Sequence, residues 1–230
     1  MKQLIVFFIL FPLMICAQTN FEKGELFLGE AKFNQAQLCF ENFLASNPGH
    51  LKTIEYLGDI AGHTKSWDNA LLYYKKLKTL KPNEANYYYK YGGALGMKAT
   101  QVNKFKALGM IGEIRSSFEK AIVLNPKHLE ARWALIEFNL KLPSLVGGSE
   151  SEAIEYSNEL KDLSPVDGYL SRGHIEERYK RYSVAEQNYK KAVAIGKSKV
   201  CYQKLADLYK KMNQPEKAQK VLDEYKNSKQ

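Results

Sequence analysis

The sequence predicts an all-α fold in which about six antiparallel helix pairs stack into one solenoid. The first observation is a pattern of small, large and helix-breaking residues that returns at a period of about 34 residues. The second is the composition of an ordered protein, with 45% hydrophobic and 12% aromatic residues and only 7 prolines. One helix pair is too small to bury its own apolar face, so this period predicts stacked units that share a continuous core. Arrays of this kind are binding surfaces far more often than catalysts.

Residues 1–17 are expected to be a secretory signal peptide that is not part of the fold. Lys2 supplies a positive charge, residues 4–15 form an apolar run, and Ala17 offers a small residue for cleavage. The apolar run is too short to span a bilayer comfortably. A lipid anchor on Cys16 is an alternative, although the bulky residue before it disfavours lipidation. We therefore expect an exported protein, periplasmic or secreted, with the solenoid occupying residues 18–230.

The second unit shows the pattern most clearly. It predicts a first helix, helix A, over residues 51–63 and a second, helix B, over residues 67–80. Helix B carries apolar residues on one face, at i, i+4 and i+7, which are Ala70, Tyr74 and Leu77. Gly58 keeps helix A slim where helix B crosses it, and Pro82 marks the turn to the next unit because it cannot continue the helix.

The pattern recurs in the first, fifth and sixth units. The equivalent small and large residues are Gly24, Ala36, Phe40, Gly173, Ala185, Tyr189, Ala206, Ala218 and Leu222. In the fifth unit Lys197 stands where proline is usual. The expected units are therefore about 18–50, 51–84, 85–128, 129–165, 166–198 and 199–230.

The third and fourth units depart from the period. In the third, residues 99–105 are expected to bridge to a lengthened helix B over about 106–124. In the fourth, the segment 142–149 is an insertion between the two helices. Its glycine pair, Gly147-Gly148, permits positive φ, and Ser149 or Ser151 can cap the next helix.

The recurring set resembles the tetratricopeptide repeat (TPR), and the resemblance covers essentially the whole mature chain. In the second unit it is carried by Leu57-Gly58, Ala61, Trp67, Ala70, Tyr74, Leu77 and Pro82. The resemblance implies a right-handed superhelical array of helix pairs. The two longer units look like a group of exported bacterial TPR proteins with a P-x-x-x-G-G insert, formed in this chain by Pro143 and Gly147-Gly148. We know of no activity common to that group.

The resemblance also implies that helix A lines an inner groove for a protein or peptide partner. The groove positions carried over to this chain are Glu55, Asp59, His63, Tyr89, Lys90, Trp133, Glu137, His174, Arg178 and Asp207. Tyr89 and Trp133 would be the anchors, because aromatic side chains bury much area at low entropic cost. The alternative, in which both rings pack between neighbouring helices, stays open. Glu55 and Asp59 stand where the version that grips acidic C-terminal tails has Lys and Asn, so a chaperone-tail receptor is disfavoured.

No catalytic or metal-binding motif is present in the sequence. The four histidines, His50, His63, His128 and His174, lack the spacing of zinc ligands, and His50 and His128 are expected to be turn residues. The glycine pair is not a phosphate-binding loop, since it lacks the following Lys and the preceding strand. We therefore expect no enzyme activity, no cofactor, no metal and no nucleic-acid partner. Cys39 and Cys201 lie in the first and last units, too far apart for a disulfide.

The formal net charge of +9 is concentrated at the C-terminal end. From Arg178 to Gln230 there are 14 Lys and Arg against 5 Asp and Glu. A basic patch favours anionic partners, so the alternative function is docking to anionic lipid or glycan through this end. The simpler interpretation is a solvated helix face, where Lys is a good helix former. Membrane association is thus expected only through this patch or through a lipidated Cys16.

Overall fold

The computed structural model describes residues 19–228, and the expected signal peptide with Cys16 and Ala17 lies outside these residues. Over the described range the chain is all-helical, with twelve α-helices, one short 3₁₀ turn and no strand. The predicted fold class is confirmed.

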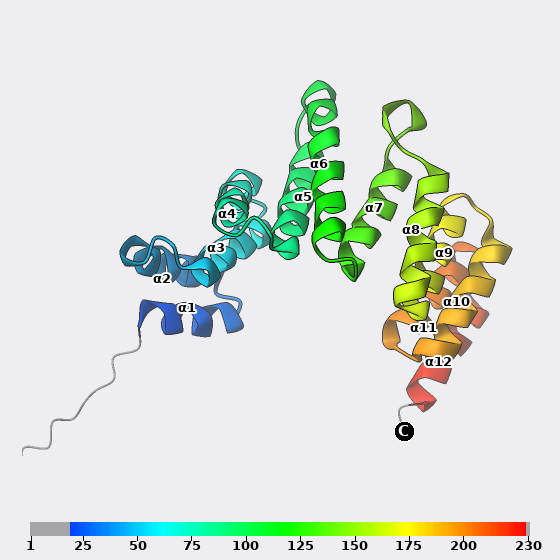
Figure 1. Cartoon of the computed structure of the whole chain (residues 1–230). Coiled ribbons are helices and arrows are strands. Elements are labelled where there is room, and N and C mark those ends of the chain that lie inside the picture. Colours follow the sequence, from blue (N-terminus) through cyan, green and yellow to red (C-terminus); the bar gives the residue numbers. More distant parts are fainter. Residues whose placement is uncertain (1–18, 229–230) are drawn as a thin grey trace, which may run out of the picture.

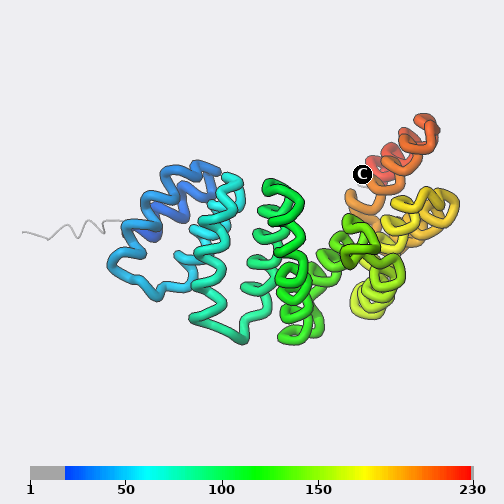
Figure 2. The backbone as a smooth tube through the Cα atoms, turned by 90° about the horizontal axis from the view of Figure 1, so that it is seen from above, coloured from blue at the N-terminus to red at the C-terminus, as the bar shows by residue number. Residues whose placement is uncertain are grey.

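The helices form six consecutive antiparallel pairs, which follow one another in chain order from one end of the molecule to the other (Figures 1 and 2). The first helices of the pairs, termed A, are α1 (Asn20–Gly29), α3 (Leu51–His63), α5 (Ala85–Ala99), α7 (Leu129–Lys141), α9 (Pro165–Arg178) and α11 (Lys199–Lys211). The second helices, termed B, are α2 (Phe33–Ser46), α4 (Trp67–Leu80), α6 (Lys104–Leu124), α8 (Glu150–Leu163), α10 (Tyr182–Gly196) and α12 (Pro215–Asn227).

In most pairs, helix A crosses helix B where a glycine meets a large side chain. In four pairs the large residue is aromatic and packs directly on a glycine, and these pairs are Gly24–Phe40, Gly58–Tyr74, Gly92–Phe118 and Gly173–Tyr189. A Cβ atom added to Gly58 would lie 2.5 Å from the Tyr74 ring. The glycine is therefore required by the close approach of the two helices, as the sequence predicted for Gly58.

Four of the A–B turns share one backbone conformation without using glycine. Their turn residues, Ala31, Lys65, Lys180 and Asn213, have φ values of 55°, 59°, 60° and 58°. The residue that follows donates its N–H to a carbonyl five residues earlier, as in the 2.8 Å bond from Ser66 N to Ala61 O. This bond satisfies a carbonyl that the end of helix A leaves free and reverses the chain within three residues.

Two histidines that were predicted to be turn residues have a more defined role. Nδ1 of His50 accepts the N–H of Thr53, and Nδ1 of His128 accepts the N–H of Ala131. Each side chain thus caps the N-terminus of an A helix by accepting one of its free backbone N–H groups.

The lengthened helix of the third unit, α6, has 21 residues against 15 in α5. It begins at Lys104, two residues earlier than expected, because the side chain of Asn103 accepts the N–H of Lys106 and caps the helix. In the fourth unit the insertion contains a 3₁₀ turn, Ser144–Val146, followed by Gly147 with φ of 102°. Ser149 caps α8, as one of the two expected serines.

Arg115 of the lengthened helix α6 bonds to the insertion of the fourth unit and to the helix that follows it. Its guanidinium donates to Glu152 at 2.6 Å and to the Gly147 carbonyl at 2.7 Å. Both lengthened connections, α5 to α6 and α7 to α8, project at the same edge of the array (Figure 1). The edge between the third and fourth units is therefore one continuous feature, held by an arginine in the middle of α6.

The A helices form the inner side of the curved array. Consecutive A helices pack on each other in the C-terminal half, α5 on α7, α7 on α9 and α9 on α11, whereas no two consecutive B helices within residues 19–228 make comparable contact. Helices that approach one another more closely lie on the inside of a curve. The inner face is therefore built from A helices, as the resemblance implied.

The crossing at Gly58 predicts a position-specific loss of stability. Gly58→Ala should destabilise the array by about 1–3 kcal/mol, because its Cβ overlaps the Tyr74 ring. The matched control is Gly62→Ala in the same helix, whose Cβ would meet nothing closer than 3.9 Å. That control should gain about 0.5–1 kcal/mol from helix propensity. Urea unfolding of both variants measures the difference, and equal midpoints would contradict the observed crossing.

Candidate functional site

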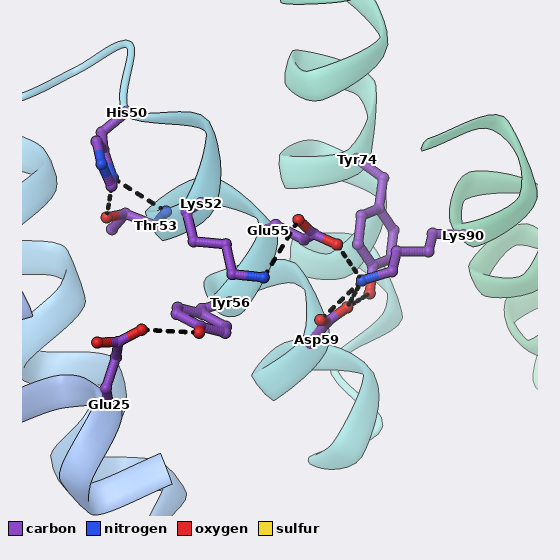
Figure 3. Close-up of polar contacts among 9 residues, drawn as sticks. All are labelled: Glu25, His50, Lys52, Thr53, Glu55, Tyr56, Asp59, Tyr74 and Lys90. Carbon is purple, nitrogen blue, oxygen red and sulfur yellow. Dashed lines mark hydrogen bonds and ion pairs between the residues drawn. The ribbon is translucent and has the colours of Figure 1, made fainter. Parts of the chain in front are cut away.

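The candidate site is the inner face, and its best-connected part lies on α3, α4 and α5 (Figure 3). Lys90 Nζ lies 2.7 Å from Glu55 Oε1 and 2.7 Å from Asp59 Oδ1. The Tyr74 hydroxyl donates to the same Asp59 carboxylate at 2.7 Å. Three residues predicted for the groove therefore form one network, in which a lysine of the third unit is held by two carboxylates of the second.

Tyr74 was not predicted to reach this face, because it belongs to helix B. Its ring packs on Gly58 of α3, where there is no side chain in the way. Its hydroxyl therefore reaches Asp59, the next residue of α3. Burial, followed by the neighbouring Asp59 carboxylate, raises the pKa of Tyr74 well above its ordinary value. The hydroxyl remains a protonated donor at physiological pH. The sequence could have indicated this contact of Tyr74, because the repeat pattern places Tyr74 opposite Gly58 where the two helices cross.

The network continues to the first unit through Tyr56. Its hydroxyl donates to Glu25 Oε1 on α1 at 2.9 Å, and Lys52 Nζ lies 4.6 Å from the centre of its ring. Burial, together with the hydrogen bond to Glu25, raises the pKa of Tyr56 to about 12. Tyr56 and Lys90 are separated by one repeat period and perform the same task, each bonding to the A helix of the preceding unit.

The two expected anchors, Tyr89 and Trp133, are both half-buried between helices. The ring of Tyr89 lies 5.1 Å from the His128 ring and 6.1 Å from the Phe118 ring. The indole Nε1 of Trp133 donates to Asp167 Oδ1 of α9 at 2.9 Å. These contacts agree with the alternative in which both rings pack between neighbouring helices. Their role as partner anchors stays a prediction.

Toward the C-terminus the inner face repeats the same kind of link between α7, α9 and α11. His174 Nε2 lies 2.6 Å from Glu137 Oε1, joining the A helices of the fourth and fifth units. The hydrogen bond from His174 lowers the pKa of Glu137 to about 2 despite its partial burial. Glu177 accepts both the Tyr189 hydroxyl and Lys211 Nζ at 2.8 Å, joining the fifth unit to the sixth. Sequence reasoning singled out neither Glu177 nor Lys211.

The remaining predicted residues, His63, Arg178 and Asp207, are exposed and make no inter-unit ion pair among the described residues. The His63 ring stacks on Phe33 with centroids 5.1 Å apart. With Asp59, Gly62 and Tyr74, His63 lines a shallow, open depression of about 370 Å³. Asp207 accepts the amide of Gln203 in its own helix at 2.8 Å. These positions are the part of the predicted groove that remains available to a partner.

The arrangement favours binding over chemistry. Most polar groups of the inner face are occupied by side chains of the neighbouring unit, which fixes the curvature of the surface that a partner would meet. Among residues 19–228, no group of three or more His, Cys, Asp or Glu side chains is placed to hold a metal ion. Cys39 and Cys201 are both free in the described part of the chain.

Comparison with known proteins places this architecture among the TPR arrays. Residues 21–85 and residues 200–228 each match a family model described as tetratricopeptide repeat. Two segments of the chain, one near each end, therefore match tetratricopeptide repeats in sequence. No curated protein matches the sequence.

Solved TPR structures share the fold at low sequence identity. PilW, described as a widely conserved type IV pilus biogenesis factor, is 16% identical with a TM-score of 0.65, covering 88% of this chain and 88% of PilW. A thermophilic TPR protein of Thermus thermophilus is 16% identical with a TM-score of 0.63, covering 88% and 97% of the two chains. YrrB, described as a TPR protein with an unusual peptide-binding site, is 14% identical with a TM-score of 0.53, covering 79% and 87%. At these identities the likeness establishes the fold, which is one that generally binds protein or peptide partners.

Within the described range, no helix has the length and apolar character needed to cross a membrane.

The Lys90 network predicts a stabilising role across the boundary between two units. Lys90→Met should lower the free energy of unfolding by about 1–3 kcal/mol, because Glu55 and Asp59 would then face each other without a shared cation. Lys76→Met, on the exposed side of α4, is the matched control and should change little. Thermal and urea unfolding measure both variants. Equal stability of the two would show that the network contributes nothing.

Proposed function

We propose that this protein is a non-catalytic scaffold that holds a protein or peptide segment along the inner face of its A helices. The observation that carries the proposal is the construction of that face. Its curvature is fixed by polar links between successive A helices, and the positions that these links leave exposed, His63, Arg178 and Asp207, are open to a partner segment. A surface that is rigid before binding spends less of its binding energy on ordering side chains.

The exposed part of the inner face indicates the chemistry of the partner. The depression beside His63 combines an imidazole with the Asp59 carboxylate and the Tyr74 ring, and Arg178 and Asp207 offer one charge of each sign further along. Such a surface fits an extended segment with alternating polar and charged side chains. The peptide-binding site for which YrrB is described, on a similar fold, supports this use of a TPR array.

Two features support a location in the bacterial cell envelope. The N-terminal residues have the pattern of a secretory signal peptide, with cleavage expected after Ala17. The longer third and fourth units resemble exported bacterial TPR proteins, and the similar fold of PilW, a pilus biogenesis factor, agrees with such a setting.

The second candidate function is docking to anionic lipid or glycan through the basic C-terminal end. The observation that favours it is a set of exposed lysines without an ion pair in the described residues, namely Lys197, Lys199, Lys204 and Lys220. Other cations of this end are occupied, since Lys190, Lys210, Lys211 and Arg181 each pair with a carboxylate. Exposed cations without an ion pair therefore remain at this end for an anionic partner.

The groove and the basic end predict different binding behaviour. A partner segment identified by mass spectrometry after capture with the purified protein, and then made as a synthetic peptide, should bind about tenfold or more weakly to Trp133→Ala. Combined substitution of His63, Arg178 and Asp207 by Ala should have a similar effect. Replacing Lys197, Lys204 and Lys220 by Gln should change the affinity little, and raising the salt concentration should weaken binding only modestly.

Two comparisons make this binding test decisive. Asp167→Ala removes the hydrogen bond to the Trp133 indole but leaves the ring in place. If the Trp133 ring contacts the partner directly, this variant should still bind the peptide. If Trp133 acts only by packing between helices, binding should weaken. Loss of binding in the lysine variant, together with full binding by the groove variants, would assign the site to the basic end.

Export predicts a defined mature N-terminus. N-terminal sequencing of the protein purified from a bacterial host should begin at Gln18. A start at lipidated Cys16 would make the protein membrane-anchored, and a full-length product in the cytosol would contradict export.

A further inference from the structure

The N-terminal part of α6 carries an apolar face that nothing in its own array covers. Phe105 is 87% exposed and Leu108 is 46% exposed. Gly109 and Gly112 lie in open space, where an added Cβ would meet no atom within 4 Å. These four residues fall at i, i+3, i+4 and i+7, so they share one side of the helix.

This face is not needed to build the array. The buried residues of α6 begin at Ile114 and lie toward its C-terminal end. The earlier part of the helix extends the third unit at the edge that projects in Figure 1. In the next unit, Leu145 in the α7–α8 insertion, which projects at the same edge, is 97% exposed. Large apolar side chains gathered on a projecting edge mark an interaction surface more often than a solvated one.

The array itself shows how such residues pack. At its internal crossings, aromatic rings cover glycines, as Phe118 covers Gly92 and Tyr74 covers Gly58. Phe105 is an aromatic residue without such a glycine, and Gly112 is a glycine without such a ring. The exposed face thus contains an aromatic ring and a glycine, the two residue types that pack on each other at the internal crossings.

Phe105 and Gly112 are placed so that each can pack on the other in a second copy of the same face. If two α6 helices cross antiparallel about a two-fold axis beside Leu108 and Gly109, Phe105 of each copy lies opposite Gly112 of the other. A two-fold interface requires this reciprocity, because each residue pair then occurs twice. The glycines let the two backbones approach closely enough for the rings to pack.

The charges on one flank of the face are also self-complementary. Lys106 and Glu113 lie on the same side of α6, seven residues apart. The antiparallel crossing brings Lys106 of one copy beside Glu113 of the other. Within the described residues Lys106 makes no ion pair, and Glu113 accepts the Tyr91 hydroxyl at 2.7 Å through one of its two carboxylate oxygens.

From this complementarity we infer that the protein forms a two-fold homodimer through the Phe105–Gly112 face of α6. The interface is small, so the dimer is reversible and sensitive to concentration. It leaves the inner face of both arrays free. Dimerisation therefore joins two binding surfaces in one particle and is independent of the function proposed for the groove.

Sedimentation velocity of the purified mature protein, from micromolar to millimolar concentration, tests the dimer. Phe105→Ser and Gly112→Leu should each raise the dissociation constant by about tenfold or more. Gly112→Leu is the sharper variant, because its added Cβ meets no atom within 4 Å in the single chain, whereas its side chain would fill the notch in the dimer. Its thermal midpoint should equal or exceed that of the wild type. Leu72→Ser, on α4 with 64% exposure, is the control and should dimerise normally.

Disulfide trapping tests the position of the two-fold axis. In a Cys39→Ser background, Leu108→Cys should form a covalent dimer under mild oxidation, since the two copies of this residue lie beside the axis. Leu72→Cys should not. A protein that stays monomeric at every concentration would overturn the inference. So would a monomer that binds vesicles of anionic phospholipid in a Phe105-dependent manner, and so would equal trapping at both cysteines.

Discussion

The packing of an aromatic ring on a glycine, where helix B crosses helix A, is the interaction on which the rest of this structure depends. It sets the separation of the two helices in four of the six pairs, because a Cβ on the glycine would occupy the place of the ring. It also decides the chemistry of the inner face. The rings of Tyr74 and Tyr189 come close enough to helix A for their hydroxyls to reach Asp59 and Glu177.

The inner face is consequently part of the framework as well as a candidate binding surface. Lys90, His174 and Lys211 each bond to a carboxylate of a neighbouring A helix. In a solenoid, where each unit contacts only its neighbours, such links transmit orientation from one unit to the next. These links hold the candidate binding surface in place, and its exposed residues are those that the links leave free.

The two longer units interrupt this regularity in a coordinated way. The extension of α6 and the insertion before α8 both project at one edge, and Arg115 joins them by bonding to the Gly147 carbonyl and to Glu152. Gly148 fits its loop closely, since an added Cβ would lie 1.9 Å from the Leu142 carbonyl oxygen. The insertion therefore has a defined shape, although its Leu145 side chain is exposed.

The sequence by itself determined the helices and their order, because helix periodicity, caps and helix-breaking residues act over a few positions. The bounds of α3 and α4, and the glycine at 58, follow from such local rules. The groove positions were expected from the resemblance to the tetratricopeptide repeat, and their role in binding stays a prediction. Only the tertiary structure decided what those residues do. The pairing of Lys90 with Glu55 and Asp59, the bond from Trp133 to Asp167, and the arrival of Tyr74 from helix B depend on the angle between successive units. That angle results from the packing of many side chains at once, and no local pattern in the chain specifies it.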